Sequence, residues 1–258
     1  MFSEERKAKI IDFISNYSRA SVQDLSDYLK VSESTIRRDL KELQQSNQIQ
    51  RTHGGAVSLN NVNFEPTIMA KEIEYVDEKI AIAKKAVEWI EEGDTILLDA
   101  GTTTQPIFKE LKSFKKLTIV TNSILFLRDF SPAPGIEMIF LGGSLRNETL
   151  ASVGPFAEQN LGMIRVDKAF VAINGIHVTE GLTTPNLIEA RIKKLMIQNA
   201  QKVILLSDSS KAGKISFAKV ADLKEINTFI TDSHLDPELK ASMEEMGIEV
   251  CLTGHLIT

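Results

Sequence analysis

The stretch from Val31 to Ala56 carries residue types that bind nucleic acid, spaced so that they share one side of a helix. Ser32 is a favourable N-cap, because its hydroxyl can accept a backbone N–H of the first turn. Ile36, Leu40 and Leu43 then recur at the helical period and form one apolar stripe. The polar side carries Ser34, Thr35, Arg37, Arg38 and Lys41. Arginine pairs bidentately with guanine or grips phosphate, and small hydroxyls bond to either, so this side suits a DNA major groove.

The flanking segments distinguish this interpretation from a solvated surface, on which Glu33–Arg37 and Arg38–Glu42 would pair at i, i+4. Upstream, Ser21 to Asp24 is a capping box that opens a second short helix. A tight turn joins the two helices, as in a helix-turn-helix. Downstream, extended residues flank Gly54-Gly55, which predicts a small hairpin, or wing, although the glycines alone would indicate only a permissive turn. The candidate phosphate contacts on this wing are Arg51 and His53.

The C-terminal part of the chain alternates between two kinds of segment. Short β-branched runs predict strands at Thr95–Leu98, Leu117–Thr121, Glu137–Leu141, Lys168–Ile173, Val203–Ser207, Ile226–Ile230 and Glu249–Leu252. Helices are predicted between most of them, at Gln105–Leu111, Ile124–Phe130, Pro155–Leu161, Asn186–Ala200 and Pro237–Met246. A further helix is predicted from about Thr67 or Asp77 to Glu92. This alternation indicates a mostly parallel sheet covered on both faces.

Polar and glycine-bearing loops follow the first five of these strands. In open α/β sheets, ligands bind outside the carboxyl ends of the strands, near helix N-termini. Gly101 lets the backbone approach an anion, and Lys211 supplies a point charge for phosphate. Each loop alone has a structural explanation as a cap or a turn, but together they favour a single pocket. The candidate ligand-binding residues are Asp99, Gly101, Thr102, Thr103, Asn122, Ser123, Gly142, Gly143, Gly175, Asp208, Ser210 and Lys211.

Composition provides for a sizeable core but gives DNA binding little support. The chain has 258 residues, of which 43% are apolar, enough for one large domain or two. Its formal net charge is −5, although nine positive and eight negative side chains give residues 1–60 a charge of +1. The prediction of DNA binding therefore rests on the pattern of residues rather than on net charge.

Several classes of function lack the motifs that they require. No P-loop, G-x-G-x-x-G turn, nucleophile motif or zinc-ligand spacing is present, so we expect no cofactor, no metal and no catalytic residue. Glu189 and Lys193 are spaced at i, i+4 and could face a pocket, but a surface ion pair is the default expectation. The single cysteine, Cys251, and the absence of a long apolar run fit a cytoplasmic protein without a membrane partner.

The N-terminal motifs resemble those of the DeoR-type bacterial transcriptional regulators. The matching segments are Val31–Leu40, with T-I-R-R-D-L, and Arg51–Ala56, with R-x-H-G-G-A. Farther along, the likeness continues at Asp99–Thr103, Thr121–Ser123, Leu141–Gly143, Asp167–Phe170, Gly181–Thr183, Asp208–Lys211 and Thr231–Asp232. The family commonly shows G-I-D where this chain has Gly175-Ile176-His177, and we expect His177 to be a loop side chain.

This resemblance implies an α/β fold in two parts. A winged helix-turn-helix domain would occupy residues 1–58, a linker 59–76 and a sensor domain 77–258. The sensor domain would be Rossmann-like, mostly parallel and related in fold to ribose-5-phosphate isomerase. Its implied partners are double-stranded operator DNA, a phosphorylated sugar effector and further copies of the chain, as a dimer or tetramer. The implied function is that of a transcriptional regulator, most simply a repressor of a carbohydrate-metabolism operon.

Two other functions remain open at this point. The first is a sugar-phosphate isomerase-like enzyme with an accessory DNA-binding domain, in which Asp99, Asp167, Glu189 or Asp208 supplies a general base. We disfavour it because none of these carboxylates stands in a clear acid–base motif. The second is an architectural DNA-binding protein that has no small-molecule ligand.

Overall fold

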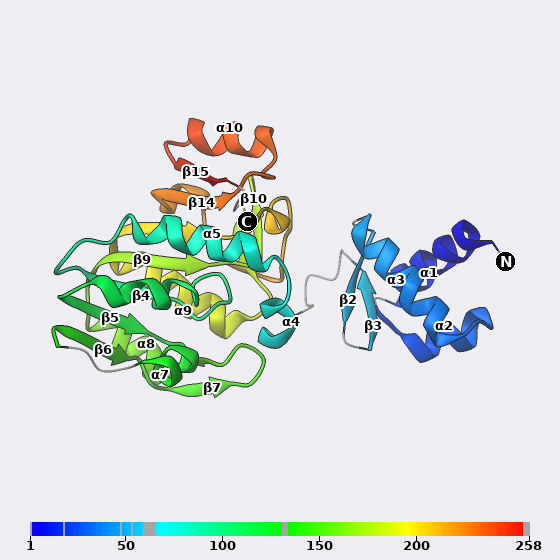
Figure 1. The fold of residues 1–258 in the computed structure, drawn as a ribbon, viewed down its shortest axis with the longest axis horizontal. Helices are drawn as coiled ribbons and strands as arrows, with labels where there is room; N and C mark the ends of the chain where they lie inside the picture. Colours follow the sequence, from blue (N-terminus) through cyan, green and yellow to red (C-terminus); the bar gives the residue numbers. More distant parts are fainter. Residues whose placement is uncertain are drawn as a thin grey trace. The chain divides into compact units, whose positions relative to one another are not determined.

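The computed structural model describes residues 2–17, 19–46, 48–52, 54–58, 65–130 and 134–254. The chain divides into two compact units, Met1–Pro66 and Thr67–Thr258, whose elements are labelled in Figure 1. The predicted wing residue His53 lies outside the described residues. Across the described part of the chain, every helix is too short or too polar to cross a membrane.

The N-terminal unit is a winged helix-turn-helix, as the sequence predicts. Its helices are α1 (Ser3–Tyr17), α2 (Val22–Leu29) and α3 (Glu33–Gln45), and its strands are β1 (Arg19–Ser21), β2 (Ile49–Thr52) and β3 (Gly55–Ser58). The Ser21–Asp24 capping box opens α2, and Ser32 caps α3 by accepting the Thr35 N–H at 3.3 Å. Between the two helices Lys30 adopts a left-handed conformation, with φ at 56°. The core contains Ile10, Ile14, Leu25, Leu29, Ile36, Leu40 and Leu43.

Gly55 does more than permit the turn of the wing. Strand β3 pairs with both β1 and β2, in the order β1-β3-β2, and Gly55 lies opposite Ser21. A Cβ atom at Gly55 would come within 1.9 Å of the Ala20 carbonyl oxygen, whereas one at Gly54 would meet nothing within 4 Å. The second glycine therefore allows the close approach of β3 to β1 that joins the wing to the helices.

The C-terminal unit is built on a seven-stranded parallel sheet. Its strands are β4 (Thr95–Leu98), β5 (Leu117–Thr121), β6 (Ile136–Phe140), β9 (Val166–Ala172), β12 (Ala200–Leu206), β14 (Thr228–Asp232) and β15 (Glu249–Thr253). They run parallel in the order β15-β14-β12-β9-β4-β5-β6. All seven coincide with predicted strands to within a few residues, and the predicted fold class is confirmed.

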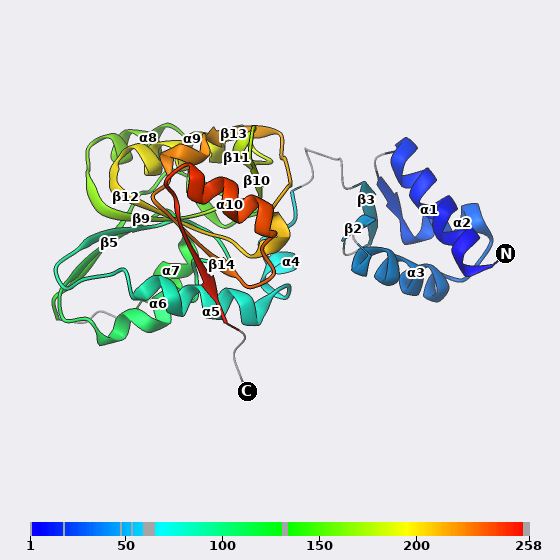
Figure 2. The same cartoon turned by 90° about the horizontal axis from the view of Figure 1, so that it is seen from above.

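Helices cover both faces of this sheet (Figure 2). The first face carries α5 (Val76–Val87), α6 (Ile107–Glu110) and α7 (Ile124–Asp129), and the second carries α8 (Pro155–Gly162), α9 (Leu187–Gln198) and α10 (Pro237–Glu245). Alternate strand residues supply the two cores. Ile96 and Leu98 of β4, for example, belong to the core under α5, whereas Leu97 belongs to the core under α9.

Several short elements in this unit were not predicted. They are the hairpin of β7 (Ser144–Arg146) and β8 (Ala151–Val153), and the antiparallel set of β10 (Gly175–His177), β11 (Gly181–Thr184) and β13 (Ala218–Ala221). The helix predicted from about Thr67 or Asp77 to Glu92 is divided into α4 (Ile68–Glu72) and α5, and α4 lies within the range predicted as a linker. Thr67 caps it, Ile68 is buried, and the Ile68 N–H donates to the Glu148 carbonyl at 2.7 Å. The C-terminal unit therefore begins at Thr67, ahead of the boundary at 77 that the sequence predicts.

Candidate functional site

The polar face of α3 is open to solvent and its opposite face is buried. Ser34, Arg37, Arg38 and Lys41 are exposed and Thr35 is half-buried. Of the two ion pairs considered for a solvated surface, Glu33–Arg37 forms at 2.9 Å, whereas Glu42 pairs with Lys7 at 2.8 Å. Among the described residues Arg38 has no ion-pair partner. Its guanidinium is therefore free to bind a base edge or a phosphate.

A buried ion pair, which the sequence analysis missed, holds α3 from behind. Asp39 is 0% exposed and accepts hydrogen bonds from Nε and Nη2 of Arg6 in α1, the latter at 2.9 Å. Because Asp39 directly follows two arginines, it is easily assigned to the polar face of the helix. Its position three residues after Ile36 and one before Leu40 places it on the apolar side, and this spacing could have indicated that it is buried.

The wing presents one cationic side chain within the described residues. Arg51 lies in β2 and is half-buried. Its Nε is buried and has no hydrogen-bond partner in the described part of the chain. Because this donor is buried it does not reach a phosphate as it stands, and the contact of Arg51 with phosphate stays a prediction.

A pocket of about 500 Å³, counting its open mouth, lies at the carboxyl ends of β4 and β9. The chain runs from β4 through β5 to β6 on one side and then returns to β9 on the other. This point of reversal is where open α/β sheets bind ligands. The predicted residues that line the pocket are Gly101, Thr102, Thr103, Asp208 and Lys211. Other lining residues, outside the predicted set, are Lys71, Glu74, Lys79, Thr149, Asn174, Glu189 and Lys193.

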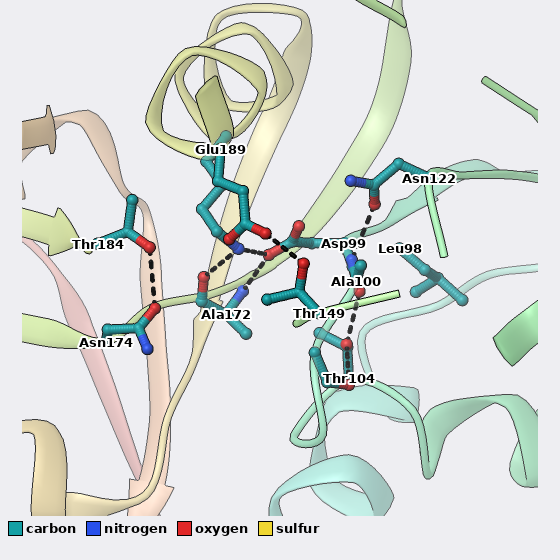
Figure 3. A network of polar contacts seen from close by, with 12 residues as sticks. Leu98, Asp99, Ala100, Thr104, Asn122, Thr149, Ala172, Asn174, Thr184 and Glu189 are labelled. Carbon is teal, nitrogen blue, oxygen red and sulfur yellow. Dashed lines mark hydrogen bonds and ion pairs between the residues drawn. The ribbon is translucent and has the colours of Figure 1, made fainter. Parts of the chain in front are cut away.

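Asp99 lies in the wall of the pocket and joins the two central strands to α9 (Figure 3). It is 1% exposed, and its carboxylate accepts hydrogen bonds from Lys193 Nζ and from the Ala172 N–H at 3.0 Å. Lys193 Nζ also donates to the Ala172 carbonyl at 2.9 Å. Burial raises the pKa of Asp99, and the Lys193 ammonium acts in the opposite direction. This buried pair orders the pocket wall at the point where the strand order reverses.

Glu189 and Lys193 are not the surface ion pair that their spacing suggested. Both are buried, and each has other partners. Glu189 accepts a hydrogen bond from the Thr149 hydroxyl (Figure 3). It also pairs with Arg146 at 3.0 Å. The expectation was wrong because α9 turns this side toward the pocket and the β7–β8 hairpin covers it.

Two further predicted residues, Asn122 and Ser123, lie beside the loop that follows β4 and help to position it. Asn122 Oδ1 accepts the Ala100 N–H at 2.8 Å, and the Thr104 hydroxyl donates to the Asp99 carbonyl at 2.6 Å (Figure 3). Ser123 is buried beside Asn122. These contacts shape the Gly101–Thr103 loop, whereas the two side chains at 122 and 123 lie outside the pocket lining.

The predicted glycines that follow β6 and β9, which are Gly142, Gly143 and Gly175, also lie outside the pocket lining. A Cβ at Gly143 would come within 2.6 Å of the Val153 carbonyl oxygen, and Gly143 has φ at 112°. A Cβ at Gly175 would come within 2.5 Å of the Lys214 carbonyl oxygen. Gly142 has φ at 69°. These three glycines therefore serve backbone turns and close packing.

Lysine side chains gather at one end of the pocket. Lys79 Nζ donates to the carbonyl oxygens of Lys71 and Glu74, the latter at 2.5 Å. Lys211 Nζ lies 3.1 Å from the Ser210 hydroxyl oxygen, and that hydroxyl also bonds to the Asp208 carboxylate. Burial lowers the pKa of Lys79. Cations held partly out of water in a pocket are suited to bind an anion.

Comparisons with known proteins agree with both halves of this description. Residues 6–62 match the family model of the DeoR-like helix-turn-helix domain, and residues 74–233 match that of the DeoR C terminal sensor domain. The HTH-type transcriptional regulator GlpR of Haloferax volcanii is 41% identical over 250 residues, 97% of this chain and 98% of its own. The HTH-type transcriptional repressor GlcR of Bacillus subtilis is 35% identical over 254 residues, 98% of this chain and 97% of its own.

Among solved structures, ribose 5-phosphate isomerase A of Methanocaldococcus jannaschii aligns with this chain. The alignment covers 52% of this chain and 53% of the isomerase, at 20% identity and a TM-score of 0.37. At that score the similarity carries no argument about function.

Proposed function

This chain belongs to the DeoR family of helix-turn-helix transcriptional regulators, and we propose that it is a repressor of a carbohydrate-metabolism operon, controlled by a phosphorylated sugar or a related metabolite. Family membership rests on matches that span both units and on relatives of the same length. The chain is accordingly a regulator and not an enzyme. That GlcR is named a repressor supports repression as the mode of action.

We propose that the polar face of α3 reads the operator. In this arrangement the exposed Arg37 and Arg38 bind base edges or phosphates in the major groove, and Arg51 on the wing binds backbone phosphate. Ser34, Thr35, Lys41 and His53 complete the proposed contact set. Because one such head reads a short site, a homo-oligomer that places two heads on adjacent half-sites would strengthen binding.

The single observation that carries the effector proposal is the composition of the pocket. Its lining combines the lysines Lys79 and Lys211 and the Gly101–Thr103 loop with the side chains of Asn174 and Glu189. Phosphate binds ammonium groups and backbone N–H donors, whereas sugar hydroxyls bond to amides and carboxylates.

In this proposal the ligand acts by favouring one of two arrangements of the chain. It must bind the arrangement with low operator affinity more tightly than the other, because a ligand with equal affinity for both arrangements does not change their populations. Asp99, Lys193, Asn122 and Ser123 hold the pocket in shape, and Asp208, Ser210 and Lys211 contribute its charged rim.

A thermal-shift screen tests the effector proposal. Purified full-length protein is heated with triose, pentose and hexose phosphates, with the matching free sugars as controls. A phosphorylated ligand at a hundred times its dissociation constant should stabilise the C-terminal unit by about 2.7 kcal/mol, and the free sugar should give almost no shift. Equal stabilisation by the free sugar, or none by any phosphate, would rule the proposal out.

A further inference from the structure

The segment Thr67–Tyr75, here called the strap, lies between the two units along the chain and also borders the pocket. It contains α4, whose Ile68 is buried and bonded to the Glu148 carbonyl. Lys71 and Glu74 of the strap line the pocket. The strap is the first segment of the C-terminal unit, so any movement of it is transmitted along the backbone toward the DNA-binding unit.

One side chain holds the end of the strap in place. Lys79 of α5 is 5% exposed, and its ammonium donates to the carbonyl oxygens of Lys71 and Glu74. The Lys71 carbonyl also accepts the backbone N–H groups of Ile73 and Glu74, so Lys79 adds a side-chain bond to the turn that ends α4 and a second bond to the Glu74 carbonyl just beyond it. Within the described residues this ammonium has no carboxylate partner.

The same ammonium faces the pocket. It has three N–H donors, of which two are used by the strap carbonyls. Lys79 lines the pocket beside Asp208 and Lys211, and Asp208 and Lys211 act on its charge in opposite directions. An anion in the pocket would engage the third donor and attract the ammonium, which weakens its hydrogen bonds to the strap carbonyls.

The strap also has room to move and is held in an uncommon backbone conformation. A second hollow, of about 1380 Å³ including open solvent, is also lined by Lys79, together with Glu72, Val76 and Phe108. Tyr75, the last residue of the strap, has a left-handed backbone with φ at 53°. Such a conformation is strained for a residue other than glycine and persists only where neighbouring contacts hold it.

We infer that Lys79 couples the pocket to the DNA-binding unit, because its ammonium contacts the anionic group of the ligand and the strap carbonyls at once. Ligand binding redistributes the hydrogen bonds of Lys79 and loosens the carboxyl end of α4, at the start of the C-terminal unit. The inference rests on the proposed function, since it requires an anionic effector in this pocket. It assigns Lys79 as both a ligand contact and a positioning residue for the strap.

Hydrogen–deuterium exchange on the full-length protein tests this coupling. The probes are inorganic phosphate and the sugar phosphate that gives the largest thermal shift. We expect either probe to speed amide exchange across 68–75 in the wild type. Lys79→Met should show fast exchange in the strap without ligand and no further change with it. Lys84→Met, an exposed lysine on the same helix, is the matched control and should behave as the wild type.

A second variant separates coupling from ligand binding. Thr67 caps α4 and lies outside the pocket lining, so Thr67→Ala should bind the sugar phosphate with unchanged affinity. In the wild type we expect the ligand to lower operator affinity by about 5- to 150-fold, and in Thr67→Ala by several-fold less.

The possible results of these experiments distinguish a failure of the coupling role of Lys79 from a failure of the effector proposal. If the sugar phosphate stabilises the protein but leaves strap exchange unchanged, the coupling role of Lys79 is wrong while the effector proposal stands. Wild-type strap exchange in ligand-free Lys79→Met would also overturn the coupling role. If no sugar phosphate or inorganic phosphate binds, the effector proposal fails and the coupling inference fails with it.

Discussion

Asp39 and Arg6 form a buried ion pair with two hydrogen bonds, directly behind the exposed arginines of α3. Arg37 and Arg38 precede Asp39 in sequence but point to solvent. The pair links α3 to α1, so it sets the angle at which the polar face is presented. Three adjacent charged residues thus divide into two suited to bind DNA and one that positions them.

Asp39→Asn should destabilise the N-terminal unit by about 3–5 kcal/mol, because it leaves the Arg6 charge buried without its counter-ion. Hydrogen exchange of α1 and α3 amides in the full-length protein measures this change. The control is Glu33→Gln, which removes an exposed pair worth roughly 0.2–0.5 kcal/mol. Equal increases in amide exchange in the two variants would show that the buried pair stabilises the unit no more than the exposed pair does.

Gly55→Ala should destabilise the wing, since its Cβ would overlap the Ala20 carbonyl oxygen. Overpacking of this kind costs about 1–3 kcal/mol or more. Gly54→Ala is the matched control, because that Cβ would meet nothing within 4 Å. Exchange rates of β1 and β3 amides should rise in the first variant and change little in the second; a reversed order would contradict the assigned role of Gly55.

Arg38→Ala should weaken operator binding and lower the slope of log affinity against log salt by about 1, if its guanidinium contacts phosphate. If it contacts a guanine instead, discrimination at one base pair should fall by about 1–3 kcal/mol. Fluorescence anisotropy with labelled operator over a salt series measures both. Lys224→Ala removes an exposed charge from the C-terminal unit and should leave affinity and slope unchanged. An Arg38→Ala variant with wild-type affinity and slope would exclude Arg38 from the interface.

Effector binding should weaken at alkaline pH earlier than ordinary lysine titration would cause. Burial lowers the pKa of Lys79 in the folded protein, and an anion binds the protonated form. As pH rises through this lowered pKa, still below the ordinary lysine value of about 10.4, the charge and the affinity that it contributes are lost together. Calorimetric titration at increasing pH should show this loss in the wild type and not in Lys79→Met. Parallel pH profiles for the two proteins would contradict it.

The sheet was predictable because its strands carry their own signals. The inner strands are apolar runs buried on both faces, as with Ile96–Leu98 and Phe170, and the partly exposed edge strands β6 and β15 are apolar or β-branched runs as well. The β7–β8 hairpin and β10 have only three residues per strand. Such short strands are held by tertiary packing rather than by local preference, so the sequence analysis did not find them.

The pocket was only partly predictable for a related reason. Gly101, Thr102, Thr103, Asp208 and Lys211 follow strands directly, and the rule for open α/β sheets places them together. Lys79 precedes the first strand of the sheet and reaches the pocket through the packing of α5. Glu189 and Lys193 have the spacing of a surface pair, and periodicity does not show which side of a helix a hairpin will cover.

The most direct test of the central claim is operator release by a sugar phosphate, compared between the wild type and Lys211→Ala. Lys211 lines the pocket of the C-terminal unit, so the variant should bind labelled operator normally. We predict that the sugar phosphate releases operator from the wild type and fails to release it from Lys211→Ala at the same concentration. Equal release from both proteins would contradict the assignment of the pocket as the effector site.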